Sequence, residues 1–587
     1  QYVGEIATEA LSPTVPVDHF FEPTPHMPSR DVQQRLAMWK ARLGDTASSP
    51  AARDDVNRMV VNNGVELIAS TINPPDNAMA VNGDGTMVLA INSRVLFADV
   101  QGRILFQRGL ESFFTAAING PFRAQFFCDP RVLFDQFSQR FIVTAMTCLG
   151  NSASSQLGIA ISKTANPSDG WWLYQLNGNQ SDLLSTNTWI DFPNVTASET
   201  DVYVAANLFT DNGTYRQAFV ATMRKQPMLD GNQLQPTDVQ RFLRLSGEPY
   251  ALFPVVRRPN DGLESVVMIS NGIGNDVSDG IDVYEFKRIN DAPIQVERTT
   301  VRVPAFEPPS FSAQPGSTVI LSCFDQRGAG SVVRNGTVTY VYSVRGQQGA
   351  AVEVVQLRTV NGRWTATRSR RLERPSSNMT YPSIALMDPQ DDASEMVLAY
   401  TYASGTEAPG IASRTLDTAL RSSEELLIRP GDGPVEFQSS YDFSRWADYT
   451  AAVTDISSST PGVWVFAPYG ARSGVWNNYL ARIERNTDVS VLYERGAMES
   501  KERVYPNPSA DDAVSIEIVA SDIEAMSVEL ISLDAAVRRE VYRGTLREGR
   551  NVLTCFLSDL PQGMYGIVFR TSSNVRTIPF VRVSGGQ

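Results

Sequence analysis

Short apolar or alternating segments recur from about residue 55 to residue 495, and they constrain the fold more than any other feature of the chain. Turns rich in Gly, Asn, Asp, Pro and Ser separate them, and no helical period runs through this stretch. They group into seven sets of four segments, which begin near residues 78, 132, 194, 252, 318, 381 and 448. A repeat of four strands at this spacing is typical of a β-propeller. Two stacked β-sandwiches are the alternative, and they would need no repeat.

The fifth and seventh sets have specific predicted boundaries. The fifth is predicted to open with a strand at 318–323, and the seventh is predicted to close with a strand at 489–493. The sequence thus predicts an all-β chain in which a seven-bladed β-propeller occupies residues 55–495.

A short motif opens three of the sets. Trp189-Ile-Asp-Phe-Pro193 parallels Trp446-Ala-Asp-Tyr-Thr450, and Asn378-Met-Thr-Tyr-Pro382 is a degraded third copy. The first strand of a propeller blade lines the central channel, so these residues are predicted to ring its mouth. Packing between neighbouring blades also requires such aromatic residues, and it explains the motif without any further function.

Composition excludes several classes of function. The chain has 587 residues and a formal charge of −13, and this acidic balance argues against nucleic-acid binding, which requires clustered positive charge. No run of about 18 apolar residues is present to span a membrane. The two histidines, His19 and His26, both precede residue 30. A Ser-His-Asp triad or a His-ligated zinc site in the main body is therefore excluded.

Catalysis in the propeller must then use carboxylates, Tyr or Arg. The candidate constellation lies at the predicted channel mouth and consists of Asp191, Tyr381, Arg445 and Asp448, with Asp129 and Arg131 nearby. Paired carboxylates could cleave glycosides without histidine. Structural ion pairs between the same carboxylates and arginines are the favoured interpretation, and the sequence leaves catalysis undecided.

One loop offers oxygen ligands for calcium, the only cofactor that the sequence raises. Four side chains lie within eight residues, interleaved with glycines: Asn275, Asp276, Asp279 and Asp282. Their spacing differs from that of an EF-hand, and the same residue types are common in ordinary turns. A second acidic loop, weaker as a candidate, contains Asp388, Asp391, Asp392 and Glu395.

The four cysteines are Cys128, Cys148, Cys323 and Cys555. Cys128 and Cys148 each lie ten residues from Ser138, which is in a predicted hairpin turn. Antiparallel pairing about that turn would place them opposite one another, within reach of a disulfide. Two buried thiols are the alternative. Cys323 and Cys555 fall in different predicted domains and are expected to be unpaired.

Both ends of the chain differ from the repeat. Residues 1–54 are rich in proline and contain one amphipathic helical stretch, 31–43, which could dock on this chain or on a partner. Residues 502–587 contain alternating strands, a Pro506-Asn-Pro508 entry and a hairpin with Gly563 and Tyr565. They are predicted to form a small β-sandwich.

The repeat region resembles a family of secreted bacterial propeller proteins that have no established activity. The resemblance covers roughly residues 73–485 and rests on motifs that occur in the family's order: Asn73-Pro-Pro-Asp76, Asp129-Pro-Arg131, Gln314-Pro-Gly316, Tyr381-Pro-Ser383 and Arg445-Trp-Ala-Asp-Tyr449. Ala447 stands where the family tends to have glycine. The resemblance implies a propeller and export, and it implies no catalytic residue.

The C-terminal region resembles the sorting domain of the type IX secretion system of Bacteroidota. The resemblance rests on Pro506, Asn507 and Pro508, on Gly563 and Tyr565 in the Leu-x-x-Gly-x-Tyr hairpin, and on a final basic strand from Val575. It implies a secreted protein at the cell surface that uses this secretion machinery as a partner.

The sequence therefore favours a secreted, surface-displayed propeller that binds a protein or a glycan, or serves as a structural scaffold. Two alternatives stay open. One is an extracellular glycan-active hydrolase or lyase that uses the carboxylates at the channel mouth. The other is a subunit of an extracellular filament or surface layer, assembled through the N-terminal segment.

Overall fold

A computed structural model shows two compact units, residues 1–487 and 488–587. The structure describes residues 2–6, 59–69, 73–115, 126–272, 277–437, 443–472, 474–485, 502–505, 509, 513–520, 525–532, 538–545, 549–557, 560–570 and 575–583. The predicted helix at 31–43 and both histidines lie outside the described residues. Within them, no helix is long and apolar enough to cross a membrane.

The first unit is built from antiparallel sheets of four strands, one of them extended to five. The first sheet contains β3 (Ala78–Val81), β4 (Met87–Ile91), β5 (Arg94–Ala98) and β6 (Ile104–Gly109). The second contains β7 (Phe127–Asp135), β8 (Arg140–Thr147), β9 (Gln156–Ser162) and β10 (Trp171–Asn177), with β1 (Tyr2–Ile6) added beside β10. The third contains β11 (Trp189–Ala197), β12 (Asp201–Phe209), β13 (Tyr215–Arg224) and β14 (Val239–Phe242).

Four further sheets follow in chain order. The fourth contains β15 (Phe253–Pro254), β16 (Val266–Ser270), β17 (Ser278–Lys287) and β18 (Gln295–Phe306). The fifth contains β20 (Gly328–Arg334), β21 (Thr337–Arg345), β22 (Ala350–Val360) and β23 (Arg363–Leu372). The sixth contains β24 (Asn378–Leu386), β25 (Met396–Ala403), β26 (Gly410–Leu416) and β27 (Leu426–Arg429). The seventh contains β29 (Ala451–Thr454), β30 (Gly462–Gly470), β31 (Trp476–Arg485) and β2 (Met59–Ala69).

In the part of the chain that the structure describes, helices are few and short. They are α2 (Leu110–Thr115), α3 (Ser181–Leu184) and α4 (Lys225–Leu229), with 3-10 turns at Pro167–Asp169 and Pro236–Asp238. All of them connect strands or sheets.

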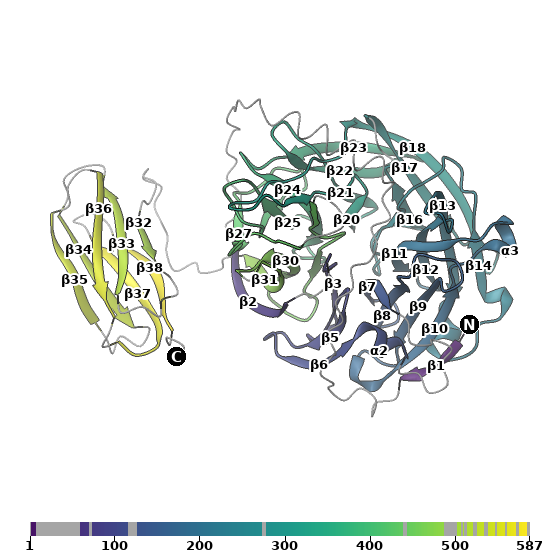
Figure 1. Cartoon of the computed structure of the whole chain (residues 1–587), viewed down its shortest axis with the longest axis horizontal. Coiled ribbons are helices and arrows are strands. Elements are labelled where there is room, and N and C mark those ends of the chain that lie inside the picture. Colours follow the sequence, from purple (N-terminus) through teal and green to yellow (C-terminus); the bar gives the residue numbers. More distant parts are fainter. Residues whose placement is uncertain are drawn as a thin grey trace. The chain divides into compact units, whose positions relative to one another are not determined.

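The sheets form a ring. The first strand of each sheet contacts the first strand of the next, and β29 of the last sheet contacts β3 of the first. Figure 1 shows β3, β7, β11 and β20 near the centre, and β6, β14, β18, β23 and β27 at the periphery. Hydrophobic cores fill the spaces between neighbouring sheets; in one of them Ile142 and Leu157 of the second sheet pack with Val202 and Phe219 of the third. The predicted all-β propeller fold is confirmed. The blade number stays a prediction, with these seven sheets of the described chain as its support.

The fifth and seventh sheets correct two of the predicted strands. Residues 318–323 do not open the fifth sheet, because β19 (Ile320–Ser322) pairs in parallel with β28 (Phe443–Arg445) in a separate two-stranded sheet. The opening strand is β20, whose Gly-Ala-Gly start looks like a turn in the sequence. The fourth strand of the seventh sheet is β2, from the N-terminal part of the chain, and residues 489–493 lie outside the described residues.

Strand β2 closes the ring by pairing with β31, so residues more than 400 positions apart in the sequence share one sheet. In Figure 1 the purple β2 lies beside the green β31. An ion pair reinforces this closure: Arg429 of the sixth sheet lies 2.8 Å from Glu66 of β2 and rests over the ring of Tyr469. Tyr469 also donates a hydrogen bond of 2.6 Å to Glu66.

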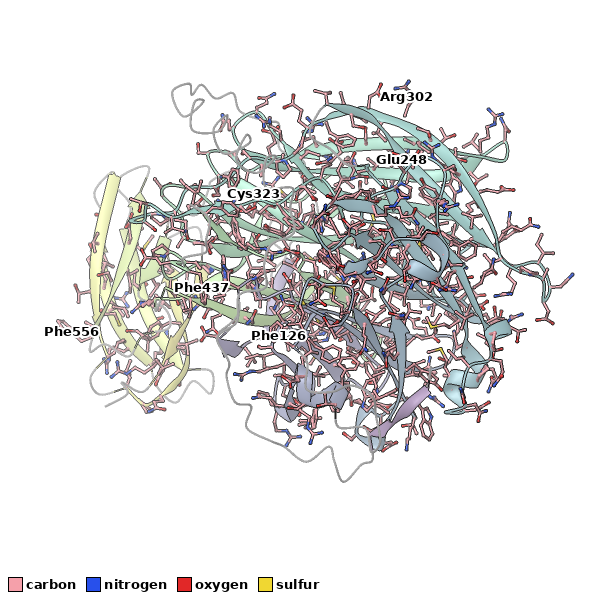
Figure 2. The ribbon with its side chains drawn as sticks, turned by 45° about the vertical axis from the view of Figure 1, so that its right-hand side comes forward. Phe126, Glu248, Arg302, Cys323, Phe437 and Phe556 are labelled. Atoms are coloured by element: carbon pink, nitrogen blue, oxygen red, sulfur yellow. A yellow bond between two sulfur atoms is a disulfide. The ribbon has the colours of Figure 1, made fainter. Side chains whose placement is uncertain are left out.

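The second unit is a β-sandwich. One sheet contains β32 (Glu502–Tyr505), β33 (Ala513–Ala520) and β36 (Gly549–Phe556), and the other contains β35 (Arg538–Thr545), β34 (Ala525–Ser532), β37 (Gly563–Arg570) and β38 (Val575–Arg582). Gly563 begins β37, and the buried Tyr565 donates a hydrogen bond of 2.6 Å to the carbonyl of Pro561. The edge strand β36 leaves Phe556 68% exposed, pointing outward in Figure 2. Pro506, Asn507 and Pro508 lie outside the described residues, so the sorting function of this motif stays a prediction.

The structure joins Cys128 to Cys148 as a disulfide with Cα atoms 5.9 Å apart. The register differs from the symmetric one expected about Ser138. Cys128 faces Met146, because a bulge between Cys128 and Arg131 shifts the pairing of β7 and β8. Cys323 and Cys555 are buried, and neither forms a disulfide with another described residue.

Replacing both Cys128 and Cys148 by serine is expected to lower the free energy of unfolding by about 2–4 kcal/mol, since the bond constrains the unfolded chain. Denaturant unfolding of the double variant and of the wild type checks this. Adding a reductant should destabilise the wild type by the same amount and leave the variant unchanged. Equal stability of the two oxidised proteins would contradict it.

Candidate active site at the centre of the ring

A repeated backbone feature shapes the centre of the ring. Where the chain enters six of the sheets, one residue adopts a positive φ of 48–63°; these residues are Asp76, Asp129, Phe192, Ala251, Phe324 and Tyr381. Residues other than glycine rarely adopt this conformation, and it persists where surrounding structure enforces it. Proline follows in three cases and fixes the next residue, at Pro130, Pro193 and Pro382. The feature places acidic or aromatic side chains in the interior of the ring.

Side-chain hydrogen bonds hold neighbouring entry segments together. The Asn92 side chain accepts the backbone N–H of Asp129 at 2.7 Å and donates to the Asp76 carboxylate at 2.7 Å. The other oxygen of that carboxylate accepts the backbone N–H of Asp448 at 2.6 Å. Asn207 accepts the N–H of Ala251 in the same way, at 2.9 Å. Asp76 therefore links the first sheet to the seventh, where the ring closes.

Aromatic side chains fill part of the channel. Trp446 is fully buried, stacks on Trp476 with ring centres 6.1 Å apart, and lies 6.0 Å from the ring of Tyr381. Tyr381 donates to the carbonyl of Ser322, and Tyr449 donates to that of Pro130, both at 2.7 Å. These contacts join β19 and the entry segments into one core. The contacts of Trp446 and Tyr381 are those of the packing role that the sequence predicts.

Trp189 has a different environment from its counterpart Trp446. It is also buried, but it stacks on Phe209 at 5.0 Å and donates its Nε1–H to the carbonyl of Thr210. It therefore packs within its own sheet.

Three arginines alternate with aromatic rings beside this core. The guanidinium carbon of Arg131 lies 3.3 Å from the ring centre of Tyr449 and 5.0 Å from that of Phe192. The guanidinium carbon of Arg327 lies 4.1 Å from the ring centre of Phe192 and 4.0 Å from that of Phe324. Arg445 lies 5.9 Å from the ring of Phe324. Arginine over an aromatic face is a favourable cation–π arrangement, and here it holds three positive charges near the ring axis.

The carboxylates of this cluster differ in their partners. Asp448 forms an ion pair with Arg445, and Asp325 forms one with Arg327 at 2.7 Å. Asp129 and Asp191 have no ion-pair partner among the described residues. Asp129 is 7% exposed, whereas Asp191 is only partly buried. The cluster thus contains two carboxyl groups without a paired cation, one of them within reach of solvent.

Burial and like charges shift the pKa values of these groups upward. Burial raises the pKa of Asp191 to about 6 against the opposing effect of Arg327, and Asp448 adds to the rise. Burial, followed by the charges of Asp191, Asp76 and Asp448, raises the pKa of Asp129 well above its usual value. Burial and the charge of Asp448 raise the pKa of Asp76 to about 7. Such shifts are common at functional sites, because desolvated carboxyl groups can hold a proton near neutral pH.

The structure brings the predicted catalytic candidates together in one cluster. The charges of Asp191, Asp448 and Arg445 shift the pKa of Asp129, and those of Asp129 and Asp448 act on the pKa of Arg131. Asp448 and Arg445 also lie close enough to Tyr381 to act on its pKa. Sequence reasoning missed Asp325 and Arg327, and it noted Asp76 only as part of a motif. The sequence does hold a weak signal for these residues. Phe324-Asp325 follows an apolar run, and Asp76 follows two prolines, but neither segment is similar enough to the Trp189 and Trp446 motifs to be aligned with them.

The calcium candidates are only partly described, since Asn275 and Asp276 lie outside the described residues. Asp282 forms an ion pair with Arg298 at 3.0 Å and accepts a hydrogen bond from Thr300 at 2.6 Å. Asp279 pairs with Arg302, which lies at the outer rim of β18 in Figure 2. No group of three or more metal-ligating side chains occurs in the part of the chain that the structure describes. The calcium site stays a prediction, and arginines already engage two of its four side chains.

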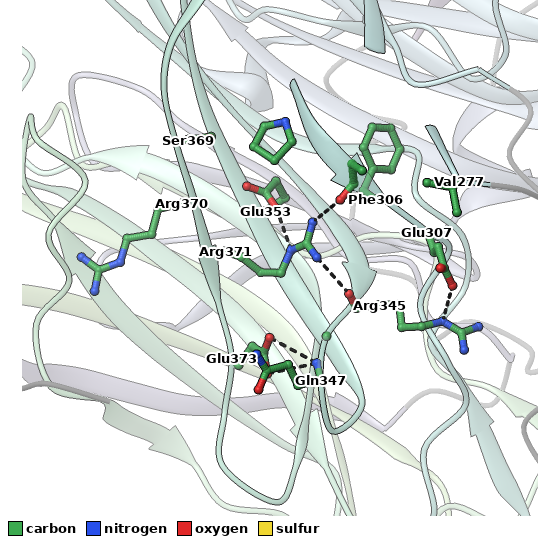
Figure 3. Close-up of a pocket in the computed structure, with 13 residues that line it drawn as sticks. Val277, Phe306, Glu307, Arg345, Gln347, Glu353, Ser369, Arg370, Arg371 and Glu373 are labelled. Atoms are coloured by element: carbon green, nitrogen blue, oxygen red, sulfur yellow. Dashed lines mark hydrogen bonds and ion pairs between the residues drawn. The ribbon is translucent and has the colours of Figure 1, made fainter. Parts of the chain in front are cut away.

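A pocket of about 740 Å³ lies between β18 and the fifth sheet, away from the ring axis (Figure 3). Its charged groups neutralise one another. Arg371 pairs with the buried Glu353 at 2.8 Å and donates to the carbonyl of Ala305, and Arg345 pairs with Glu307 at 3.0 Å. Burial raises the pKa of Glu353, and Arg371 opposes that rise. These contacts join the fourth sheet to the fifth, and this structural role explains why the charged side chains are there.

Comparison with known proteins gives no family model and no curated protein that matches the chain. Solved structures with similar folds include the Trypanosoma rangeli sialidase in complex with sialic acid, at 8% identity over 83% of this chain and 86% of that one, with a TM-score of 0.32. They also include a Fusarium graminearum α-L-arabinofuranosidase, at 10% identity over 62% and 99% of the chains, with a TM-score of 0.36. A third is an exo-β-1,3-galactanase from Phanerochaete chrysosporium, at 9% identity over 89% and 99%, with a TM-score of 0.29. Likenesses this low transfer neither substrate nor catalytic residues to this chain.

Proposed function

We propose that the chain is a glycan-active hydrolase or lyase whose chemistry takes place at the central cluster. The observation that carries the proposal is Asp191, a partly accessible carboxyl group without an ion-pair partner among the described residues. Its pKa is raised to about 6, and it lies close enough to the buried Asp129 for their charges to interact. A carboxylate paired with a protonated carboxylic acid is the arrangement on which glycoside cleavage depends.

The two groups suit different roles. Asp129 is the more buried, and burial raises its pKa well above the usual value, so it is suited to protonate the leaving oxygen. Asp191 is ionised above pH 6 and faces solvent, so it is suited to act as base or nucleophile. Arg131, Arg327 and Arg445 offer guanidinium donors beside them for hydroxyl or acidic groups of a sugar.

The experiment is a screen of polysaccharides with the purified protein, in which mass spectrometry detects new chain ends. Products of a hydrolase gain one water, and products of a lyase gain a double bond instead. Asp191→Asn should lower the rate about a hundredfold or more, since loss of acid–base catalysis costs at least that much. The wild-type rate should fall on the acidic side of a pKa near 6.

Asp182→Asn is the matched control. Asp182 lies on α3, nine residues earlier in the chain, and its side chain is 56% exposed in an ion pair with Arg241. The control should cleave at the wild-type rate. An Asp191→Asn variant as active as the wild type would contradict the proposal, and so would a wild type that cleaves nothing in the screen.

A second candidate function is a binding or scaffold module, and the buried aromatic core favours it. Trp446 and Tyr381 fill the channel interior, and two of the central carboxylates already form ion pairs. A screen in which a glycan or surface protein binds without cleavage, equally well to wild type and Asp191→Asn, would establish this alternative. Assembly into a filament or layer through residues 1–54 remains a prediction.

We also propose that the protein is exported to the cell surface through a type IX secretion system. The C-terminal β-sandwich, with Gly563 opening β37 and Tyr565 buried beneath it, supports this proposal. Removing residues 502–587 should leave the propeller folded inside the cell, and fractionation of the native host checks it. Export of the shortened chain would contradict the proposal.

A further inference from the structure

A second pocket, of about 200 Å³, lies between the fifth and sixth sheets. Arg334 of β20 and Arg368 of β23 line it from the fifth sheet, together with Thr339 and Gln356. Met396 and Thr418 line it from the sixth. Unlike the pocket in Figure 3, it has basic side chains and no acidic side chain in its lining.

Arg334 has hydrogen-bond donors to spare. Its Nη1 donates to the carbonyls of Asp392 at 3.0 Å and Ser394 at 2.7 Å, which anchors the side chain. Its Nε and Nη2 are buried and have no hydrogen-bond partner. It is the only arginine among the described residues that leaves two such donors buried. Nε and Nη2 form the side-on fork of a guanidinium, whose spacing matches the two oxygens of a carboxylate or sulfate.

Two further arginines lie near Arg334. Arg258 lies close enough to Arg334 for their positive charges to repel each other. Its Nε is also buried without a hydrogen-bond partner. Burial lowers the pKa of both guanidinium groups. Arg368 contributes a third cation, held by a hydrogen bond of 3.0 Å from its Nη1 to the carbonyl of Thr418.

Acidic groups also lie nearby, and three of them have contacts of their own. Asp261 is engaged by Arg257 at 2.5 Å. Asp388 and Asp391, from the second acidic loop of the sequence, accept the backbone N–H groups of Gln390 and Ala393 and so shape a turn. Burial and the charge of Arg258 lower the pKa of Arg334, against the opposing effect of Asp392, Asp391 and Asp388.

Two glycines bring Arg258 and Arg334 together. Gly262 has a φ of +83°, and a Cβ there would lie 2.4 Å from the backbone nitrogen of Gly336. Gly336 in turn donates its N–H to the carbonyl of Asp261 at 2.8 Å. The loop that carries Arg258 therefore contacts the turn after β20 directly, at a distance that only glycine permits.

We propose that this pocket binds an oxyanion, and that its ligand is the carboxylate or sulfate group of an acidic saccharide. Such a group would accept hydrogen bonds from both free donors of Arg334, which otherwise stay buried and unsatisfied. The hydroxyl group of Thr339 suits the rest of a sugar. The small volume fits a single sugar unit or its charged group. The proposal does not depend on catalysis at Asp191.

The test is a titration of the full-length protein with sodium glucuronate, sodium sulfate and inorganic phosphate, followed by thermal shift and calorimetry. Sodium chloride at equal ionic strength is the baseline. Glucuronate or sulfate should bind saturably, and Arg334→Gln should weaken binding about 10- to 100-fold, the effect of losing charged hydrogen bonds. Arg363→Gln is the matched control, because it removes the same charge from an exposed position on β23, the strand that also carries Arg368.

Arg334 also links the two sheets through the carbonyls of Asp392 and Ser394, so its variant could fail to fold. Arg368→Gln, which leaves those bonds intact, then carries the test and should also weaken binding. Asp191→Asn should bind as the wild type does, which separates this site from the proposed active site. Equal weakening by Arg363→Gln, or no saturable binding of any anion, would overturn the proposal. If phosphate bound more tightly than glucuronate and sulfate, the proposal that the ligand is an acidic saccharide would be wrong.

Discussion

A chain that lacks residues 1–69 is expected to lose its closed, stably folded propeller. The deletion removes β2, which pairs with β31 from Met59 to Ala69 and supplies the outer strand of the seventh sheet. It also removes Glu66, the partner of Arg429 and Tyr469. The exposed β31 edge would then be a site for aggregation. We expect either aggregation or a melting temperature lower by about 10 °C or more, at about 2–4 °C per kcal/mol for a large domain.

A shorter deletion, of residues 1–56, is the control. It removes β1 and keeps β2, so the melting temperature should stay within a few degrees of the wild type's. A synthetic peptide with the sequence of residues 57–71 should restore part of the stability lost in the longer deletion. If both deletions melted together at the wild-type temperature, the role of β2 in closing the ring would be wrong.

Asp191→Asn is expected to stabilise the propeller above pH 7. Asp191 has a pKa of about 6 in the folded protein, compared with 3.8 in an unfolded chain, so ionising it favours the unfolded state. Each unit of difference corresponds to about 1.4 kcal/mol, which sets an upper limit of about 3 kcal/mol. Because the side chain is partly accessible, we expect a gain of about 1–3 kcal/mol. Denaturant unfolding at pH 8 measures it.

The pH dependence identifies the cause of that gain. Between pH 4 and pH 6 the folded protein holds the proton on Asp191 and the unfolded chain does not, so wild-type stability falls as the pH rises through this window. Asparagine has no proton to lose. The advantage of Asp191→Asn should therefore vanish near pH 4, grow up to pH 6 and stay constant above it.

Asp182→Asn should show the opposite sign. A hydrogen bond from Arg241 lowers the pKa of Asp182, so its ionised form stabilises the fold above the pKa of the unfolded chain. The variant should lose at most about 1 kcal/mol at pH 8, as is typical of an exposed ion pair. An Asp191→Asn variant that lost stability at pH 8 would show that the carboxylate has a partner that the structure lacks.

The strands of the propeller could largely be predicted from the sequence, because each buried sheet requires runs of apolar residues with turns between them. The failures have physical causes. Residues 318–323 are apolar because β19 is buried beside Tyr381 and Trp446 at the centre, where any conformation would require apolar side chains. The β2–β31 pairing spans more than 400 residues, and no local pattern specifies such a partner.

The central cluster could be predicted only in part. The copies at Asp191 and Asp448 share a motif, so their convergence follows from the repeat. Arg327 and Asp325 carry no such motif, and their position depends on where β20 begins. Unsatisfied donors such as Nε and Nη2 of Arg334 cannot be predicted from a sequence, because they depend on which acceptors the folded chain places near them.

The most direct test of the central claim is hydrogen–deuterium exchange of the Asp191→Asn variant, with and without the glycan that the wild type cleaves. The inactive variant keeps the glycan intact during labelling. The account predicts slower exchange in peptides that contain residues 189–193 and 445–450, which meet at the ring axis. Protection confined to the outer strands of the sheets, or to the C-terminal β-sandwich, would contradict it.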